Sequence, residues 1–243
     1  MNTQQTLDRL SKLKLNAMKD VYQALLETPI HNRPSVDAII ARMAEAETLS
    51  RIERRTAMYL KTSRLRYSAT IEDIHYNTER NLSKEQMLHF AQCDFVKRAQ
   101  NLLITGSTGC GKSFLACAIG RQACHLGLRT LYISMGKFIE KIAYAKVDGT
   151  FLKLVNNIEK HDLIIFDDFG LQPLDANSRL ALLQILEDRY ERKAIIITSQ
   201  LPVAKWYDYI DEPTIADAIM DRITSNADRI ELKGESMRHK NRK

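Results

Sequence analysis

Apolar residues recur at helical spacing in the first part of the chain. Between residues 7 and 24 they follow one another at intervals of three or four, which places them on one face of a helix. Pro34 and Ser35 form a start signal for a second helix with the same period. Two such helices bury little against each other, so we expect their stripes to dock on the rest of the chain, another copy or a partner protein, although ordinary helix packing gives the same pattern. The stripes contain Leu7, Leu10, Leu13, Ala17, Val21 and Ala24, then Val36, Ile39, Ile40 and Met43.

From about residue 68 the pattern changes to short apolar runs that alternate with helical segments. This alternation is typical of a parallel sheet with helices on both faces. The sequence therefore predicts an all-helical N-terminal interaction module, residues 1–67, followed by an α/β core, residues 68–243, with a short basic tail. The predicted strands are 101–105, 129–134, 162–167, 194–199 and 228–232, and the predicted helices are 83–91, 112–127, 177–191 and 213–224, with further helices between 136 and 160.

The segment from Gly106 to Ser113 fits the phosphate-binding pattern GxxxxGK[ST] between an apolar run and an apolar helix start. Its glycines permit backbone conformations closed to other residues and let N–H groups approach an anion. We expect Lys112 to reach the β and γ phosphates of ATP and Ser113 to hold magnesium, aided by the helix dipole. The candidate nucleotide-binding residues are Gly106, Ser107, Thr108, Gly109, Cys110, Gly111, Lys112, Ser113 and Phe114.

A second apolar run, residues 163–166, ends in the paired acids Asp167 and Asp168. A continuous apolar run fits a parallel strand covered on both faces, so its carboxylates emerge at the edge where open α/β sheets bind ligands. This is a Walker B pattern. Asp167 is the predicted magnesium ligand, and Asp168 is predicted to orient the attacking water or accept its proton. ATP and magnesium are thus the expected cofactors, and ATP hydrolysis is the expected reaction.

Two of the motifs above and three later segments form one set: 106–113, 166–170, 196–202, 217–223 and 232–238. Together these segments make the chain resemble the IstB family. IstB proteins are the ATP-binding helpers of a class of bacterial insertion sequences, related to the helicase loader DnaC within the AAA+ ATPases. The resemblance runs over essentially the whole chain and implies a P-loop AAA+ core with strand order 5-1-4-3-2. Only eleven residues follow Leu232, which we expect to be too few for the helical lid domain of many AAA+ proteins, and Arg238 is the candidate substitute for its sensor arginine.

The resemblance also implies roles for individual residues. Ser199 falls at the sensor 1 position, with Gln200 as a neighbour that also reaches toward the γ-phosphate. Arg222 matches the arginine finger, which acts in the site of a neighbouring subunit; the alternative is a surface arginine beside Asp221. Asp168 and Ser199 stand where many AAA+ members have Glu and Asn, so slow hydrolysis is expected. The predicted catalytic set is Lys112, Asp168, Ser199 and Arg222.

The net charge of +6 is concentrated in two blocks, residues 51–67 and 233–243. Such blocks neutralise DNA phosphates and give salt-dependent binding that is largely independent of sequence. A solvated face or a disordered tail gives the same composition. The candidate DNA-binding residues are Arg51, Arg54, Arg55, Arg64, Arg66, Arg238 and Lys240.

The four cysteines show no spacing typical of a metal site or a disulfide framework, and their use fits a reducing cytoplasm. The amino terminus has no apolar signal region, and no run approaches the roughly 18 apolar residues that span a bilayer. We therefore expect a cytoplasmic protein with no membrane partner and no metal cluster.

These patterns and the resemblance together predict an ATP-dependent AAA+ protein that assembles on double-stranded DNA as a ring or helix. Its expected role is to assist a transposase in target selection and integration; that partner is implied by the resemblance alone. One alternative is a DnaC-like helicase loader, although loaders often carry a cysteine cluster in their N-terminal module and residues 1–67 contain no cysteine. The other is a non-catalytic scaffold gated by ATP, which Lys112, Asp167 and Asp168 argue against.

Overall fold

The structure, a computed structural model, describes residues 2–76, 80–234, 236 and 237. The chain divides into two compact units, Met1–Met58 and Tyr59–Lys243. This division falls inside a helix, before the predicted boundary at residue 67. The last turns of that helix belong with the core because Ser63 is buried there and Tyr59 accepts a hydrogen bond of 3.3 Å from Arg129. That residues 1–67 form an interaction module stays a prediction.

The first unit is helical, as predicted, but its first apolar stripe is divided between two helices. α1 (Thr3–Lys12) and α2 (Asn16–Glu27) are separated by Lys14, whose φ of 59° is left-handed. The Leu15 N–H donates to Leu10 O and the Lys14 N–H to Ser11 O, which is the hydrogen-bond pattern of a Schellman end. The prediction of one continuous helix was therefore wrong at this point. A 3-10 turn, η1 (Ile30–Asn32), follows α2.

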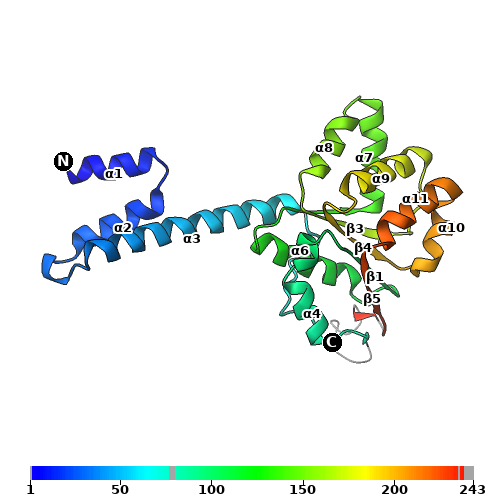
Figure 1. The fold of residues 1–243 in the computed structure, drawn as a ribbon, viewed down its shortest axis with the longest axis horizontal. Coiled ribbons are helices and arrows are strands. Elements are labelled where there is room, and N and C mark those ends of the chain that lie inside the picture. Colours follow the sequence, from blue (N-terminus) through cyan, green and yellow to red (C-terminus); the bar gives the residue numbers. More distant parts are fainter. Residues whose placement is uncertain (1, 77–79, 235, 238–243) are drawn as a thin grey trace. The chain divides into compact units, whose positions relative to one another are not determined.

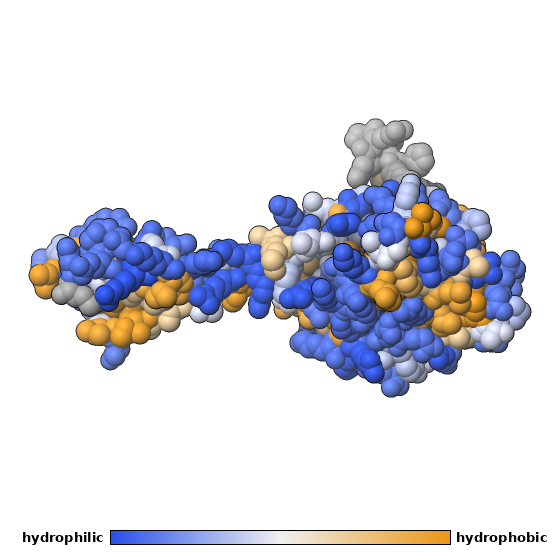
Figure 2. Space-filling view, turned by 90° about the horizontal axis from the view of Figure 1, so that it is seen from above, coloured by the Kyte–Doolittle hydropathy of each residue, from blue (hydrophilic) through white to orange (hydrophobic). Residues whose placement is uncertain are grey.

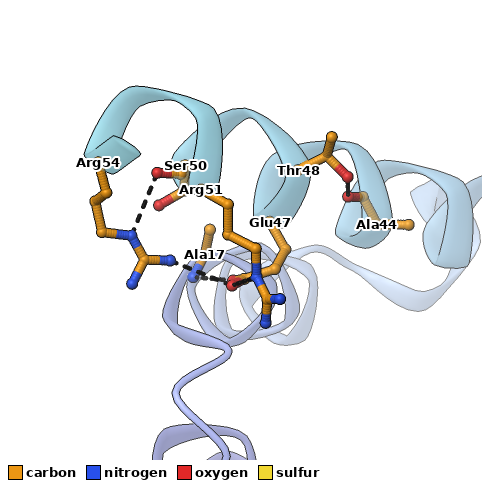
Figure 3. A network of polar contacts seen from close by, with 7 residues as sticks. All are labelled: Ala17, Ala44, Glu47, Thr48, Ser50, Arg51 and Arg54. Atoms are coloured by element: carbon orange, nitrogen blue, oxygen red, sulfur yellow. Dashed lines mark hydrogen bonds and ion pairs between the residues drawn. The ribbon is translucent and has the colours of Figure 1, made fainter. Parts of the chain in front are cut away.

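The long helix α3 (Val36–Ser63) begins where the sequence predicted, with the Ser35 hydroxyl accepting the Ala38 N–H at 3.4 Å. Figure 3 shows how α2 and α3 are joined through Glu47 of α3, whose carboxylate accepts the backbone N–H of Ala17 at 3.2 Å. The same carboxylate accepts Arg51 Nε at 2.9 Å and Arg54 Nη2 at 3.3 Å. The hydrogen bond from Arg51 lowers the pKa of Glu47, and burial opposes it. One buried carboxylate thus organises the start of α2.

Apolar side chains of this unit remain on its surface, as Figure 2 shows. No residue of α1 or α2 is buried. Ile30, Val36 and Ile40 are exposed by 82, 71 and 58%. The unit therefore keeps apolar surface uncovered within the described part of the chain.

The second unit is built on a five-stranded parallel sheet, as predicted. Its strands are arranged in the order β2-β3-β4-β1-β5. Counted from the β5 edge, this is the order 5-1-4-3-2 that the resemblance implied, and it is confirmed. The strands are β1 (Asn101–Gly106), β2 (Thr130–Ser134), β3 (Leu163–Phe169), β4 (Ala194–Ser199) and β5 (Ala227–Leu232).

Helices cover both faces of the sheet (Figure 1). Successive residues of a strand point to opposite faces, so each strand contributes apolar side chains to both layers of helices. Ile104 and Ile165 pack on one face with Leu115 of α6. Leu103 and Ile164 pack on the other face with Ile185 and other residues of α7 to α11. The short helices α5 and α10 were not predicted from the sequence. The helices are α4 (Lys84–Ala91), α5 (Asp94–Lys97), α6 (Lys112–His125), α7 (Met135–Val147), α8 (Phe151–Glu159), α9 (Ala176–Arg189), η3 (Val203–Lys205), α10 (Trp206–Ile210) and α11 (Pro213–Thr224).

Within the described residues, no helix is both long enough and apolar enough to cross a membrane.

Candidate nucleotide site

The phosphate loop joins the end of β1 to the start of α6. Gly106 ends β1 and Gly111 precedes the first residue of α6. A side chain at Gly106 would meet the carbonyl oxygen of Leu232 on β5, and one at Gly109 would meet Ser236. Both glycines also have positive φ, of 146 and 83°. Close backbone packing therefore requires glycine at these two positions.

Lys112 and Ser113 open α6 and point into the loop. Lys112 is buried, and its Nζ donates to Gly106 O and Ser107 O at 2.8 Å each. Ser113 Oγ donates to Asp167 Oδ1 at 2.7 Å. The structure thus brings the two predicted magnesium ligands together. A hydroxyl and a carboxylate are the hard oxygen donors that Mg²⁺ takes, so these residues fit that ion.

Asp167 is fully buried at the carboxyl edge of the sheet. Besides Ser113, its carboxylate accepts hydrogen bonds from the hydroxyls of Thr198 on β4 and Tyr132 on β2. Burial and the hydrogen bond to Asp167 raise the pKa of Tyr132. Hydroxyl donors on three sides compensate the buried charge and fix its two oxygens. Sequence reasoning missed both Thr198 and Tyr132.

Asp168 follows with a left-handed backbone, φ 61°. Its N–H donates to Thr198 Oγ1 at 3.2 Å. Non-glycine residues in this conformation are uncommon and tend to gather at functional sites. Because of this backbone turn, the carboxylates of Asp167 and Asp168 have different surroundings. Asp167 accepts the hydrogen bond from Ser113, whereas Asp168 lines the adjoining cavity.

Arg66 lies beside both acids, although the sequence placed it among the DNA contacts. Its Nη1 is 3.8 Å from Asp167 Oδ2 and 3.6 Å from Asp168 Oδ2. A hydrogen bond with Tyr132 is the main cause that raises the pKa of Arg66. The guanidinium also lies over the ring of Tyr67, 5.4 Å from its centroid. Arg66 thus belongs to the surroundings of the nucleotide site.

The two polar residues after β4 differ in their surroundings. Ser199 is fully buried, donates to Phe169 O at 2.5 Å and accepts the Leu201 N–H at 3.0 Å. Gln200 Oε1 accepts the hydroxyl of Thr108 in the phosphate loop at 2.7 Å. Gln200 is therefore the residue of this pair that contacts the loop. The sensor role of Ser199 stays a prediction.

A cavity of about 410 Å³ lies against the phosphate loop. This volume is within the usual range of ligand sites, about 300–1,000 Å³. Tyr67 and Phe114 line its apolar side, while Lys112, Asp168 and Gln200 supply polar groups. The remaining lining residues are Asp73, Ile74, His75, Arg80, Thr108, Gly109, Gly111, Ser113, Leu115 and Met237.

Arg222 lies at the other end of β1 from the phosphate loop. Its carbonyl oxygen accepts Asn101 Nδ2 at 3.0 Å, and Asn101 opens the strand that Gly106 ends. At about 3.3 Å per residue, the two ends are roughly 16 Å apart. The guanidinium pairs with Glu187 at 2.7 Å and Asp221 at 3.2 Å. Arg222 therefore does not contact the phosphate loop of its own chain.

The remaining DNA candidates lie around the end of α3 or in the tail. Arg51 and Arg54 are paired with Glu47 (Figure 3). Arg55 on α3 and Arg64 just after it are exposed. Arg238 and Lys240 lie outside the described residues. These contacts with DNA stay predictions.

The cysteines are buried and unpaired with one another in disulfides: Cys93, Cys110, Cys117 and Cys124. Burial raises the pKa of Cys117 to about 11 and that of Cys93 to about 12. Thiols of this kind stay protonated and act as small apolar side chains. Among the described residues, no group of three or more His, Cys, Asp or Glu is arranged to hold a metal ion.

Comparison with solved structures shows which proteins share this fold. The DnaI crystal structure superimposes with a TM-score of 0.59 at 22% identity, covering 68% of this chain and 92% of that one. The DnaC helicase loader gives a TM-score of 0.57 at 19% identity, covering 69% and 98%. Identities this low show the fold alone, and the shared fold agrees with the predicted parallel sheet flanked by helices.

Comparison of sequences shows the family. A protein of Sinorhizobium fredii whose name describes it as an insertion sequence ATP-binding protein is 39% identical over 238 residues, which is 98% of this chain and 97% of its own. The pattern of the IstB-like ATP binding proteins matches residues 8–243. With the P-loop, the paired acids and the AAA+ core in place, the chain belongs to the IstB-like ATP binding protein family.

Proposed function

We propose that this protein is a magnesium-dependent ATPase that assembles on double-stranded DNA and assists a transposase in target selection and integration. The observation that carries the ATPase is the hydrogen bond between Ser113 and Asp167 at the phosphate loop. It joins a residue of α6 to a residue of β3, and these two residues would hold the magnesium ion of a bound nucleotide. Membership of the IstB-like family and relatives named for insertion sequences support the place in transposition. A cytoplasmic location stays a prediction.

In this proposal, each side chain acts through position and charge, because phosphoryl transfer requires little covalent chemistry from the protein. Lys112 leaves the carbonyls of Gly106 and Ser107 to bind the β and γ phosphates. Ser113 and Asp167 would hold Mg²⁺, which would neutralise charge on the phosphates when bound. Asp168 orients the attacking water from its place at the cavity wall. Gln200, whose Oε1 accepts the hydroxyl of Thr108 in the loop, would contact the γ-phosphate.

In the assembled protein, a neighbouring subunit would complete the site. Arg222 lies about a strand length from its own phosphate loop, so it serves another chain's site or none. The alternative is that Arg222 acts only within its own subunit, where it forms a structural ion pair with Glu187. ATP bound between Lys112 of one chain and Arg222 of the next would make assembly depend on the γ-phosphate, and hydrolysis would release it.

DNA binding rests on charge. Arg55 and Arg64 are exposed, and the basic residues around them outnumber the acids. Such contacts neutralise phosphates and carry no sequence information by themselves. We therefore expect binding to duplex DNA that weakens steeply with salt.

A helicase loader is the second candidate, because the DnaC loader shares the fold. The relatives of higher identity are named for insertion sequences, which favours the transposition role. A pull-down of purified transposase and of replicative helicase with the ATP-bound protein separates these candidates. Binding of the helicase but not the transposase would overturn the proposal.

The third candidate is a scaffold that binds ATP without hydrolysing it. Phosphate release by the wild type, compared with Lys112→Ala, tests it directly. We expect turnover that requires Mg²⁺ and is lost in the variant. Tight ATP binding with no phosphate release, with or without DNA, would favour the scaffold.

A further inference from the structure

Arg80 lies against the phosphate loop, although it precedes Cys110 of that loop by 30 positions. Its Nη2 donates to the carbonyl oxygen of Cys110 at 2.9 Å, and its Nη1 donates to the carbonyl oxygen of His75. A Cβ at Gly111 would lie 3.0 Å from the same Nη2. The guanidinium therefore packs on the part of the loop that leads into α6.

The backbone around Arg80 is held at the end of β5. The Lys233 N–H donates to Arg80 O at 3.1 Å, and Asn81 Nδ2 donates to Glu231 O at 3.0 Å. In the sheet, β5 is the neighbour of β1 on one side, and β4 is its neighbour on the other. Arg80 thus approaches the phosphate loop from the β5 side.

Two cations line the nucleotide cavity at this loop, Arg80 and Lys112. Lys112 Nζ donates to the carbonyl oxygens of Gly106 and Ser107, much as Arg80 donates to those of His75 and Cys110. These carbonyl oxygens are uncharged. A phosphate adds the attraction of the opposite charge, and a guanidinium often binds it through two parallel N–H groups. An anion in the cavity is therefore a better acceptor for Arg80 than the carbonyls it now contacts.

The groups that the proposed function assigns to the γ-phosphate lie on the other side of the loop. Asp168 belongs to β3, and Gln200 follows β4 and accepts the hydroxyl of Thr108. The strand order places β3 and β4 across β1 from β5. A cation that reaches the loop from the β5 side is thus placed for the phosphates that precede the γ-phosphate.

We propose that Arg80 is a nucleotide-binding residue whose guanidinium contacts the phosphates that ATP and ADP share. The proposal rests on the proposed function, which places a nucleotide at the phosphate loop. It adds to the site a cation that lies outside the GxxxxGK[ST] pattern and comes from the segment before α4. Arg80 and Lys112 then hold the phosphates from two elements of the chain.

Equilibrium binding of Mg-ATP and Mg-ADP to Arg80→Gln, measured by titration calorimetry on the whole chain, tests this proposal. We expect the Kd of both nucleotides to rise about tenfold, as for loss of one charge-assisted contact, with their ratio unchanged within about twofold. The kcat at saturating ATP should stay within about twofold of wild type, because Arg80 lies away from the γ-phosphate side. Arg80→Lys keeps the charge without the planar fork, so its loss of affinity should be smaller.

Asn81→Ala is the matched control. Asn81 fastens the same segment to β5, through an exposed side chain. Arg192→Gln controls for the change in net charge, since Arg192 is an exposed arginine of the same unit. Both control variants should bind ATP and ADP as the wild type does. An equal loss of affinity in Asn81→Ala would overturn the proposal, because Arg80 would then act only by holding its segment on the sheet.

The two nucleotides separate the remaining outcomes. Unchanged affinity for both in Arg80→Gln would overturn the proposal, and so would a loss confined to ATP, which would place Arg80 at the γ-phosphate. Thermal melts accompany the titrations. If Arg80→Gln does not fold, Arg80→Lys decides: weaker binding of both nucleotides supports the contact, and wild-type affinity overturns it. Wild type that binds both nucleotides without releasing phosphate would refute the proposed ATPase alone, since equilibrium binding needs no turnover.

Discussion

Ser113 and Asp167 are 54 positions apart in the chain, and the hydroxyl of one donates to the carboxylate of the other at 2.7 Å. The contact exists because α6 begins at the carboxyl end of β1, and β3 ends at the same edge of the sheet. Parallel strands collect their carboxyl ends on one side, which is why open α/β sheets bind ligands there. The two residues that Mg²⁺ would need are therefore adjacent through the fold itself.

The first prediction concerns this pair. Ser113→Ala removes one oxygen donor, so we expect the Mg²⁺ concentration for half-maximal ATPase to rise at least about tenfold, as for loss of a charge-assisted contact. Ser113→Thr keeps the hydroxyl and is the matched control. Magnesium titrations at saturating ATP measure both. Identical Mg²⁺ dependence in wild type and Ser113→Ala would contradict the assigned site.

The second prediction separates the two sensor candidates. Ser199 bonds inside the core, whereas Gln200 bonds the phosphate loop. We expect Ser199→Ala to lower the free energy of unfolding by about 1–2 kcal/mol, because the N–H of Leu201 loses a buried partner. Gln200→Ala should lower kcat more than Ser199→Ala does. Urea unfolding and ATP turnover of both variants check this, and the reverse ranking in kcat would make Ser199 the sensor.

The third prediction is a pH dependence at Glu47. Its folded pKa is depressed below the ordinary value of 4.5 by Arg51 and the other donors. The stability it contributes is therefore present above the unfolded pKa and is lost as the pH falls through the folded pKa. Glu47→Gln should lower the melting temperature of the first unit at pH 7, and the difference from wild type should shrink as the pH falls below the unfolded pKa of the carboxyl. A pH-independent difference would mean that the loss is one of packing rather than of charge.

The fourth prediction concerns DNA. Each lost phosphate contact reduces the slope of log K against log salt by about 0.9. Replacing Arg55 and Arg64 together by alanine should reduce that slope by about 1.8 if both contact phosphates. The double replacement of Arg98 and Arg192, exposed arginines elsewhere, controls for net charge. Fluorescence anisotropy with one duplex over a salt series measures both, and equal slopes in the two double variants would exclude a specific DNA surface here.

Contiguous motifs made much of the site predictable from the sequence. Lys112, Ser113 and Asp167 stand in patterns whose chemistry fixes their spacing, and the alternation of strands and helices gave the sheet. Thr198 and Tyr132 were missed because they reach Asp167 only through strand register: Tyr132 pairs with Ile165 on β3, and Ile197 of β4 pairs with Phe166. A register is a property of the assembled sheet, which no local pattern states.

Other features could not be predicted because no local signal in the sequence marks them. Lys14 adopts a left-handed conformation without glycine or asparagine to signal it, so the helix break was invisible. Arg66 belongs to a basic run by composition, and only the path of the chain after α3 brings it to the acids. The pairing of Arg51 and Arg54 with Glu47 depends on burial of the Glu47 carboxylate, which helical spacing alone does not indicate.

If two subunits complete each ATP site, two variants that are each inactive alone should restore activity when they are mixed. Lys112→Ala removes the phosphate contact and Arg222→Ala removes the finger, while Glu187→Gln breaks the cis ion pair of Arg222 and leaves the finger intact. We expect each of the first two variants alone to be nearly inactive with DNA present, their mixture to regain turnover at shared interfaces, and Glu187→Gln to stay active. A mixture as inactive as its components, with Glu187→Gln as impaired as Arg222→Ala, would refute a site shared between subunits and leave Arg222 as a structural residue of its own chain.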